Sequence, residues 1–424
     1  MHPRRLCSLY RCFSTTKTQT KTQTKINFNA GPSQLSKNVL VQTSQAILDY
    51  NNSGSSICEL SHFNNEWKTL YNDTVKKTIN FLNIPKSHKC FYMNGGGTHQ
   101  FTTLFYNLCN KDSEVQVLVS GYWSQKAADE LSKLCKVKIV NNASELKDDN
   151  KYSFTFYCEN ETVNGIEYKN GLSFKPKNHI LVCDSCSILG GKNMDIGNYD
   201  VLFSSLSKNL GISGSTLVIL KKELLKDTSK KIPDVMNWRE YYKLNGPTPS
   251  VFTIFFTLKN LKHMIKSGGL DYYHRINTIK SNLLYKYIDN SGGFYINNID
   301  KKYRSRTNIV FTVNDSHELS KYFSDSCDLF GFIGTRHHFS DKSKGCRLSL
   351  YNSISIQDVE DIIDFMEKFK RFVLYKDLTP RYSNRFVKET DSILVRKSEN
   401  HISELSHDEQ IDILATDIGR LNKL

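Results

Sequence analysis

Three short segments of the sequence place chemically useful groups where a strand is expected to end, and the first is rich in glycine. Asn94-Gly95-Gly96-Gly97-Thr98 lies between an apolar run and a helix-like pattern. Glycine lets the backbone approach a phosphate closely, and the start of a helix offers unpaired N–H groups and a favourable dipole. The segment matches neither the G-x-x-x-x-G-K-[ST] loop nor the G-x-G-x-x-G fingerprint, and a glycine-rich turn can also be an ordinary turn.

The other two segments each supply one ionisable side chain. Asp184 directly follows the apolar run 180–183, and Lys208 follows the strand-like run 201–205. A carboxylate so placed either caps a helix or faces a heterocyclic nitrogen and keeps it protonated. A lysine so placed is either a surface residue or, in a dry pocket, an amine that loses its proton more readily and forms a covalent bond with a carbonyl. Together, a glycine-rich turn that can bind a phosphate, a carboxylate and a lysine describe a site for pyridoxal phosphate.

The elements that would position these groups alternate between helix-like and strand-like periods from residue 67 onward. Such alternation is typical of an α/β layer with a mostly parallel sheet, which binds ligands at the carboxyl ends of its strands. We expect helices over residues 67–82, 101–108 and 127–134, and strands over 90–93, 115–119, 137–140, 154–158, 180–183, 201–205 and 216–220.

The remainder of the chain suggests a second domain. Residues 221–250 are rich in lysine and turn residues and are predicted to form a loop, and helical patterns fill 251–290. A strand-rich segment begins near Gly293 and closes with a helix over 356–374. The predicted organisation is a leader (1–26), a large domain (27–290, with 27–45 contributing to the small domain), a small α+β domain (291–375) and a polar extension (376–424).

Composition is that of an ordinary globular protein. The 424 residues are 39% apolar and 24% charged, which excludes collagen-like and low-complexity chains. No apolar run approaches the roughly 20 residues that a membrane-spanning helix needs. The formal net charge of +14 is compatible with nucleic acid, anionic substrates or a basic leader. Cys183 and Cys186 alone are weak evidence for a metal, so we expect buried thiols in a reducing compartment and no metal.

The first 26 residues have the features of a targeting segment. No acidic residue precedes Asp49, whereas six basic residues precede Ile26. An amphipathic, arginine-bearing, acid-free segment is typical of organelle transit peptides, and Arg11-Cys12-Phe13-Ser14 resembles a mitochondrial processing site. The alternative is a disordered basic tail. We expect the protein in the mitochondrial matrix after cleavage of the leader.

Motifs in a characteristic order make residues 27 to about 372 resemble the phosphoserine aminotransferases, which are class V aminotransferases of fold type I. They cover about four-fifths of the chain. The motifs are Asn27-Phe28-Asn29-Ala30-Gly31-Pro32, Leu60-Ser61-His62, Gly95-Gly96-Gly97-Thr98, Gly121-Tyr122-Trp123-Ser124, Asn160-Glu161-Thr162-Val163-Asn164-Gly165, Lys208-Asn209-Leu210-Gly211 and Arg347-Leu348-Ser349-Leu350-Tyr351-Asn352. This resemblance implies a large domain with a seven-stranded, mostly parallel sheet and helices on both faces.

The resemblance also implies roles for individual residues. Lys208 would bind the cofactor covalently and move a proton between the substrate α-carbon and the cofactor C4′, and Asp184 would keep the ring nitrogen charged. Arg347 would bind the substrate α-carboxylate with two parallel hydrogen bonds. The remaining cofactor contacts would come from Trp123 (ring face), Thr162 (phenolic oxygen), and Gly96, Gly97 and Thr248 (phosphate), with Thr248 supplied by the second subunit of a homodimer. Ser207, which stands where the family has a glutamine, is also expected to contact the cofactor.

Departures from the family pattern concentrate where the distal anion of the substrate would bind. His62 keeps its family position, but Phe63 replaces an arginine, and Ser340-Asp341 aligns with a His-Arg pair. Each lost hydrogen bond to a charged group is worth roughly 1.5–3 kcal/mol. The candidates to replace those arginines are Arg336, His337, His338 and Lys342.

Two functions therefore remain open from the sequence. The first is pyridoxal-phosphate-dependent transamination in serine biosynthesis, making phosphoserine from 3-phosphohydroxypyruvate and glutamate. The alternative is a catalytically degenerate homologue retained as a structural or interaction subunit of a mitochondrial assembly, with its basic surface as a contact for RNA.

Overall fold

The computed structural model describes residues 25–226, 231–244, 247–338 and 345–378. The predicted leader up to residue 24, the extension from residue 379 and the segment around Asp341 lie outside the described residues. Residues 24–363 form one compact unit, and the described residues from 364 on belong to a second. The four-part domain organisation stays a prediction.

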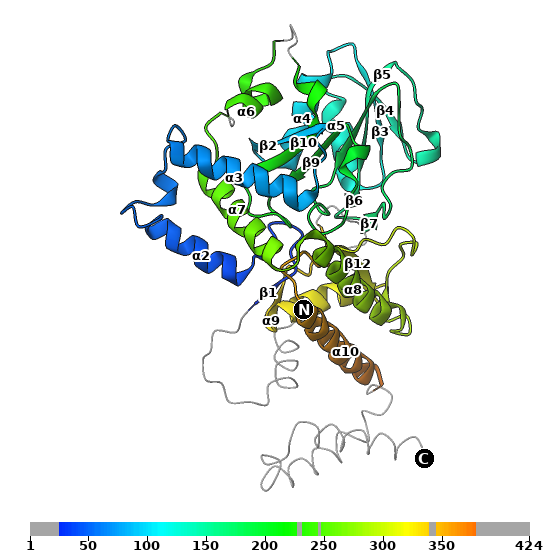
Figure 1. Cartoon of the computed structure of the whole chain (residues 1–424). Helices are drawn as coiled ribbons and strands as arrows, with labels where there is room; N and C mark the ends of the chain where they lie inside the picture. The colour runs from blue at the N-terminus through cyan, green and yellow to red at the C-terminus, as the bar shows by residue number, and fades with distance from the viewer. Residues whose placement is uncertain (1–24, 227–230, 245–246, 339–344, 379–424) are drawn as a thin grey trace, which may run out of the picture. The chain divides into compact units, whose positions relative to one another are not determined.

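A seven-stranded sheet forms the centre of the compact unit (Figure 1). Antiparallel pairing in this sheet is confined to one strand, β10, which runs against both of its neighbours, so the sheet is mostly parallel as expected. In spatial order the strands are β2 (His88–Asn94), β10 (Ser215–Lys221), β9 (Val201–Ser205), β8 (Ile180–Asp184), β5 (Tyr152–Cys158), β3 (Glu114–Leu118) and β4 (Lys136–Val140). All seven predicted strands are confirmed.

Helices cover both faces of this sheet because its strands are apolar on both sides. In β10, Leu217 and Ile219 belong to one hydrophobic cluster and Val218 and Leu220 to the other. The first cluster includes side chains of α3 (Asn65–Leu82) and α7 (Val251–Lys266), and the second includes side chains of α4 (Gly97–Leu108) and α5 (Tyr122–Leu131). Alternate side chains of a strand point to opposite faces, so a continuous apolar run needs a cover on each face.

One predicted loop is wrong in part. Within residues 221–250 the chain forms a short helix, α6 (Trp238–Leu244), and two short 3₁₀ turns, Lys222–Leu225 and Asp234–Met236. Trp238 and Tyr241 of α6 are almost fully buried in the second hydrophobic cluster. These two aromatic side chains hold the helix against the body despite the turn-rich flanks.

The strand-rich C-terminal segment follows the long helix α8 (Gly269–Asp289). It forms an antiparallel sheet of β11 (Tyr295–Ile296), β12 (Asn308–Val313) and β14 (Cys346–Ser349), and its sequence also contains an unpredicted helix, α9 (His317–Leu329). The remaining N-terminal elements are β1 (Ile26–Asn27), which pairs in parallel with β13 (Phe332–Ile333), and α2 (Lys37–Leu48). The last described helix is α10 (Ile356–Leu378). Of the helices the structure describes, none has the length and apolar character needed to span a bilayer.

Candidate active site

Eight of the ten predicted site residues line one cavity of about 400 Å³. The cavity lies where β5, β8 and β9 end and α4 begins, which is the edge at which parallel sheets bind ligands. The eight residues are Gly96, Gly97, Trp123, Thr162, Asp184, Ser207, Lys208 and Arg347, and the cavity wall is completed in part by Ala30-Gly31-Pro32 and His338. Thr248 and His62 do not line it.

The glycine segment forms the start of α4. Gly96 is the residue at the N-cap and Gly97 is the first helical residue. A Cβ atom on Gly97 would lie 2.8 Å from Sγ of Cys186, whereas a Cβ on Gly96 would meet no described atom within 4 Å. The turn is therefore packed behind Gly97 and open on the side of Gly96, and the free N–H groups of the helix start are available to a phosphate.

Asp184 places a desolvated carboxylate in the cavity. It is the last residue of β8, is 8% exposed, and its Oδ1 accepts a hydrogen bond from the backbone N–H of Cys186 at 2.9 Å. Burial raises the pKa of Asp184. A carboxylate in such a place is stabilised when a cation faces it, and the protonated ring nitrogen of pyridoxal phosphate is such a cation.

Lys208 brings an amine into the same cavity. Its Nζ donates a hydrogen bond to Oγ1 of Thr162 at 3.1 Å. Burial alone would lower the pKa of Lys208, but its interactions with the acidic groups of Tyr351, Cys186 and Asp184 outweigh burial and the pKa is raised. This direction is opposite to the sequence expectation for a dry pocket, because acidic groups surround the amine.

A short turn between β9 and Lys208 fixes the position of that lysine. β9 ends at Ser205, so Lys208 is the third residue beyond the strand. Leu206 is fully buried, whereas Ser207 lines the cavity and its Oγ lies 3.0 Å from Oγ of Ser205. Ser33 binds the turn twice, because its backbone N–H donates to the carbonyl of Ser207 at 3.0 Å and its Oγ donates to the carbonyl of Lys208 at 2.7 Å. The turn that carries Lys208 is thus anchored to the N-terminal segment of the chain.

Trp123 is positioned by a residue to which the sequence analysis gave no role. The buried carboxylate of Glu161 accepts the backbone N–H groups of Trp123 at 2.9 Å and Ser124 at 2.8 Å, and the hydroxyl of Ser124 at 2.6 Å. Gly121 leaves room for this arrangement, since a Cβ there would lie 2.8 Å from the carboxyl carbon of Glu161. Glu161 therefore caps α5 and fixes the backbone of Trp123. Its place in the 160–165 motif was the only sequence signal.

Glu161 provides a first testable expectation. Replacing Glu161 by Gln removes a charge from three hydrogen bonds, and each bond to a charged group is worth about 1.5–3 kcal/mol. We expect the affinity for pyridoxal phosphate to fall about tenfold, measured by titrating the apo-protein with the cofactor and following its absorbance. Glu223→Gln, a change on a 3₁₀ turn away from the cavity, is the matched control. Equal affinity of the two variants would show that Glu161 does not help Trp123 to bind the cofactor.

Arg347 brings a buried positive charge into the cavity from the small antiparallel sheet. The residue is on β14 and is 8% exposed, and its Nη1 donates to the carbonyl of Thr162 at 3.4 Å. Its Nε has no hydrogen-bond partner among the described residues, and burial lowers its pKa. A buried guanidinium with an unused donor is suited to a carboxylate ligand, which would restore the missing hydrogen bond.

The residues considered for the distal anion are not all in the cavity. Phe63 is 78% exposed, and the centroid of its ring is 4.1 Å from that of His62. Arg336 forms ion pairs with Asp325 at 2.6 Å and with Asp328 at 2.5 Å, so its charge is already paired. Asp341 and Lys342 lie outside the described residues.

His338 is the candidate that does line the cavity. Its ring centroid lies 4.8 Å from that of Tyr122, the first residue of α5. His337, next to it, does not line the cavity. Among the described candidates, His338 is therefore the one placed to meet the distal anion.

The paired cysteines behave as buried thiols. Cys183 and Cys186 are both buried, and burial raises the pKa of each thiol well above its usual value. Sγ of Cys186 accepts the backbone N–H of Ser205 at 3.1 Å. The described residues contain no group of three or more His, Cys, Asp or Glu side chains that could hold a metal ion.

These observations fit pyridoxal phosphate. The cavity presents an open helix start that would hold a phosphate, a buried carboxylate that would face a ring nitrogen, and the amine of Lys208, which would hold the cofactor covalently. The buried Nε of Arg347, which lacks a described partner, provides for an anionic substrate.

Comparison with known proteins agrees with this fit. Residues 26–362 match the family model described as aminotransferase class-V. A probable phosphoserine aminotransferase of Dictyostelium discoideum is 35% identical over 362 residues, which cover 81% of this chain and 96% of that protein. The structure of phosphoserine aminotransferase from Bacillus circulans subsp. alkalophilus aligns with 82% of this chain and 99% of its own, with a TM-score of 0.78 and 29% identity. A phosphoserine aminotransferase from Trichomonas vaginalis with bound PLP aligns with 81% of this chain and 99% of its own, with a TM-score of 0.74 and 25% identity.

Proposed function

Because this chain belongs to the class V aminotransferase family, we propose that it transfers the amino group of glutamate to 3-phosphohydroxypyruvate to form phosphoserine, in serine biosynthesis. It is an aminotransferase that uses pyridoxal phosphate. The observation that carries the proposal is the meeting of Lys208, Asp184 and Arg347 around one cavity, although Arg347 is far from the other two in the sequence.

Each of these residues has a distinct task. When bound, the cofactor supplies the electron sink that lets an amino group leave one α-carbon and join another. Lys208 holds the cofactor and moves the proton at the substrate α-carbon, and Asp184 keeps the ring nitrogen protonated through its negative charge. Arg347 binds the α-carboxylate and so orients the α-carbon toward Lys208.

The distal anion of the substrate is received in part by His338, since Arg336 is occupied by two aspartates. Replacing His338 by Ala is expected to raise the KM for phosphoserine about tenfold, the worth of one hydrogen bond to a charged group. The KM for alanine, which has no distal anion, should change far less. Steady-state kinetics with both amino acids measure this, with exposed His317→Ala as control. An unchanged KM for phosphoserine would remove His338 from the recognition of the substrate.

A homodimer is the second part of the proposal. Thr248 and His62, which the family resemblance places in the site, lie outside the cavity of a single chain, so a second copy would have to supply them. The exposed side of α2 supports such an interface, because Leu40, Val41 and Leu48 are 43%, 60% and 82% exposed. Light scattering of the wild-type protein is expected to give twice the mass of one chain. The double variant Val41→Asp/Leu48→Asp should have the mass of a single chain. A wild-type protein that is monomeric at micromolar concentration would contradict this part.

Mitochondrial import is the third part, and it is supported by the basic, acid-free residues 1–26. A fusion of residues 1–40 to a fluorescent protein is expected to enter mitochondria and to lose its first residues there. The same fusion with Arg4, Arg5 and Arg11 changed to Glu should stay outside. Cytosolic fluorescence of the unaltered fusion would contradict import.

The comparisons give no support to the alternative of a catalytically degenerate subunit. A direct test separates the two functions: each half-reaction is followed by adding glutamate or phosphoserine alone to the loaded protein. Conversion of the cofactor to its amine form by both amino acids is expected. Cofactor colour that neither amino acid changes would favour the degenerate homologue.

A further inference from the structure

A fully buried lysine on α8 is not used by the proposed chemistry. Lys280 has no exposed surface, and its Nζ donates to three backbone carbonyls, those of Leu350 at 3.1 Å, Tyr351 at 2.9 Å and Ile354 at 2.7 Å. An ammonium group has three N–H donors and a neutral amine has two. Only the charged form of Lys280 therefore satisfies all three carbonyls.

The carbonyls belong to the loop that follows the arginine-bearing strand. Residues 350–355 connect β14, which contains Arg347, to α10. Within the loop, the hydroxyl of Tyr351 donates to the carbonyl of Ala30 at 2.8 Å. Since Ala30 lines the cofactor cavity, the loop supports one part of the cavity wall directly.

The same loop also contacts the segment of the catalytic lysine. The backbone N–H of Asn352 donates to Oδ1 of Asn209 at 3.1 Å, and Asn209 is the residue after Lys208. The backbone of the loop therefore helps to set where the segment with Lys208 lies. A change in the shape of the loop would therefore shift the position of the Lys208 amine, which holds the cofactor.

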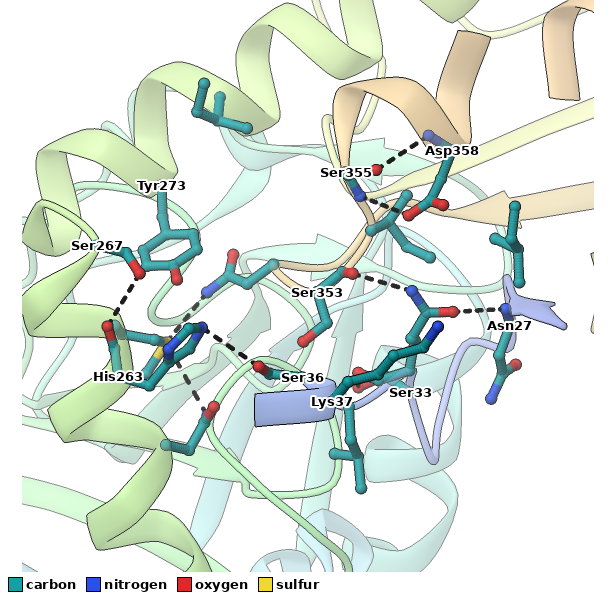
Figure 2. A pocket seen from close by; sticks show the side chains of 18 of the residues that line it. Asn27, Ser33, Ser36, Lys37, His263, Ser267, Tyr273, Ser353, Ser355 and Asp358 are labelled. Atoms are coloured by element: carbon teal, nitrogen blue, oxygen red, sulfur yellow. Dashed lines mark hydrogen bonds between the residues drawn. The ribbon is translucent and has the colours of Figure 1, made fainter. Parts of the chain in front are cut away.

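The outer side of the loop faces a second cavity, of about 920 Å³, shown in Figure 2. Ser353 and Ser355 line this cavity, and the carbonyl of Ser353 accepts a hydrogen bond from Nε2 of Gln34 at 2.9 Å. Asp358 also lines it and accepts the backbone N–H of Ser355 at 2.8 Å. Because the loop borders open space on this side, close packing does not fix it there, and the contacts with Lys280 hold its inner side.

We propose that Lys280 is a positioning residue whose ammonium group holds the 350–354 loop in the shape that places Tyr351 against Ala30 of the cavity wall and Asn352 against the segment carrying Lys208. The proposal rests on the proposed function only in that Lys208 is the residue that binds the cofactor. It adds a residue about 70 positions before the loop to the set that shapes the site.

The charge of the Lys280 side chain depends on pH. Burial lowers the pKa of Lys280 to about 7, and Asp358, at the start of α10, opposes this with its negative charge. Above about pH 7 the neutral amine makes at most two of the three hydrogen bonds, so the loop is held less firmly. The unfolded chain keeps a lysine pKa near 10.4, so between about pH 7 and 10 the unfolded state binds more protons than the folded state. The contribution of Lys280 to stability therefore rises with pH in this window.

The test compares three variants of the cofactor-loaded protein: Lys280→Met, Lys280→Arg and, as control, Lys286→Met, a change at an exposed position on the same helix. The first readout is the pH titration of the cofactor's visible absorbance, which does not depend on which amino acid is the substrate. We expect Lys280→Met to shift its midpoint, Lys280→Arg to restore it in part, and Lys286→Met to leave it unchanged. The ratio of kcat/KM between wild type and Lys280→Met should be largest below pH 7 and fall about tenfold by pH 9.

Urea unfolding is the second readout and does not require activity. Between about pH 7 and 10 the unfolding constant of wild type, relative to that of Lys280→Met, should fall by up to tenfold per pH unit. A flat ratio in this window together with an unshifted absorbance titration would overturn the proposal. If Lys280→Met does not fold, the wild-type protein and Lys280→Arg still decide, because the arginine variant stays charged and must lack the pH dependence that the wild type shows.

Discussion

Lys208→Ala protein is expected to lose about 10³-fold or more of its transamination rate, the upper part of the range for a group that transfers a proton in the transition state. Lys208 is the only lysine among the described residues that line the cofactor cavity, and its Nζ lies 3.1 Å from Oγ1 of Thr162. Without it, the described cavity offers no amine to hold the cofactor or to move the α-proton. Single-turnover kinetics with glutamate measure the loss, and Lys222→Ala on a surface turn is the control.

A second readout separates loss of chemistry from loss of folding. The Lys208→Ala variant should unfold at a urea concentration close to that of the wild type and still bind the cofactor non-covalently through the helix start and Asp184. Near-normal turnover in this variant would mean that another lysine serves as the catalytic amine.

Asp184→Asn is expected to lower kcat/KM by about 10²–10³-fold, the range seen when one preorganised electrostatic group is removed. The carboxylate is 8% exposed and burial raises its pKa, so its negative charge is unfavourable unless a cation faces it. Asparagine keeps the shape but not the charge, and the ring nitrogen then lacks the anion that keeps it protonated. Asp112→Asn, at an exposed turn, is the control.

The pH dependence of this variant checks the same point. In the wild type, acid that protonates Asp184 should reduce the rate, and the raised pKa places this loss at a higher pH than for an ordinary aspartate. The Asp184→Asn variant should lack that acid limb. Identical acid limbs in the two proteins would show that Asp184 does not act through its charge.

The large sheet could be predicted because its strands are apolar on both faces and stand out as short runs between amphipathic helices. The helix α9 was missed although Tyr322, Phe323 and Cys327 lie on its buried face, because Ser320, Ser324 and Ser326 are buried beside them and weaken the apolar pattern. The helix α6 was missed because it has only seven residues and lies among turn residues. For α6, the burial of Trp238 and Tyr241, rather than the local pattern, decides the structure.

The site was predictable to the extent that sheet geometry dictates it. Asp184 and Lys208 follow neighbouring parallel strands, whose carboxyl ends must meet at one edge. The sequence carried no separate signal for Glu161, whose role comes from reaching across to the start of α5. It also did not reveal that Arg336 is paired with two aspartates of α9, since those contacts depend on how β13 and α9 pack.

The most direct measurement is the site of borohydride labelling in the purified, cofactor-loaded protein. Reduction fixes the cofactor to the amine that holds it, and mass spectrometry of the peptides then identifies that residue. The cofactor mass is expected on the peptide that contains Lys208, with loss of the visible absorbance. A label on any other lysine, or no label in protein that still binds the cofactor, would contradict the account.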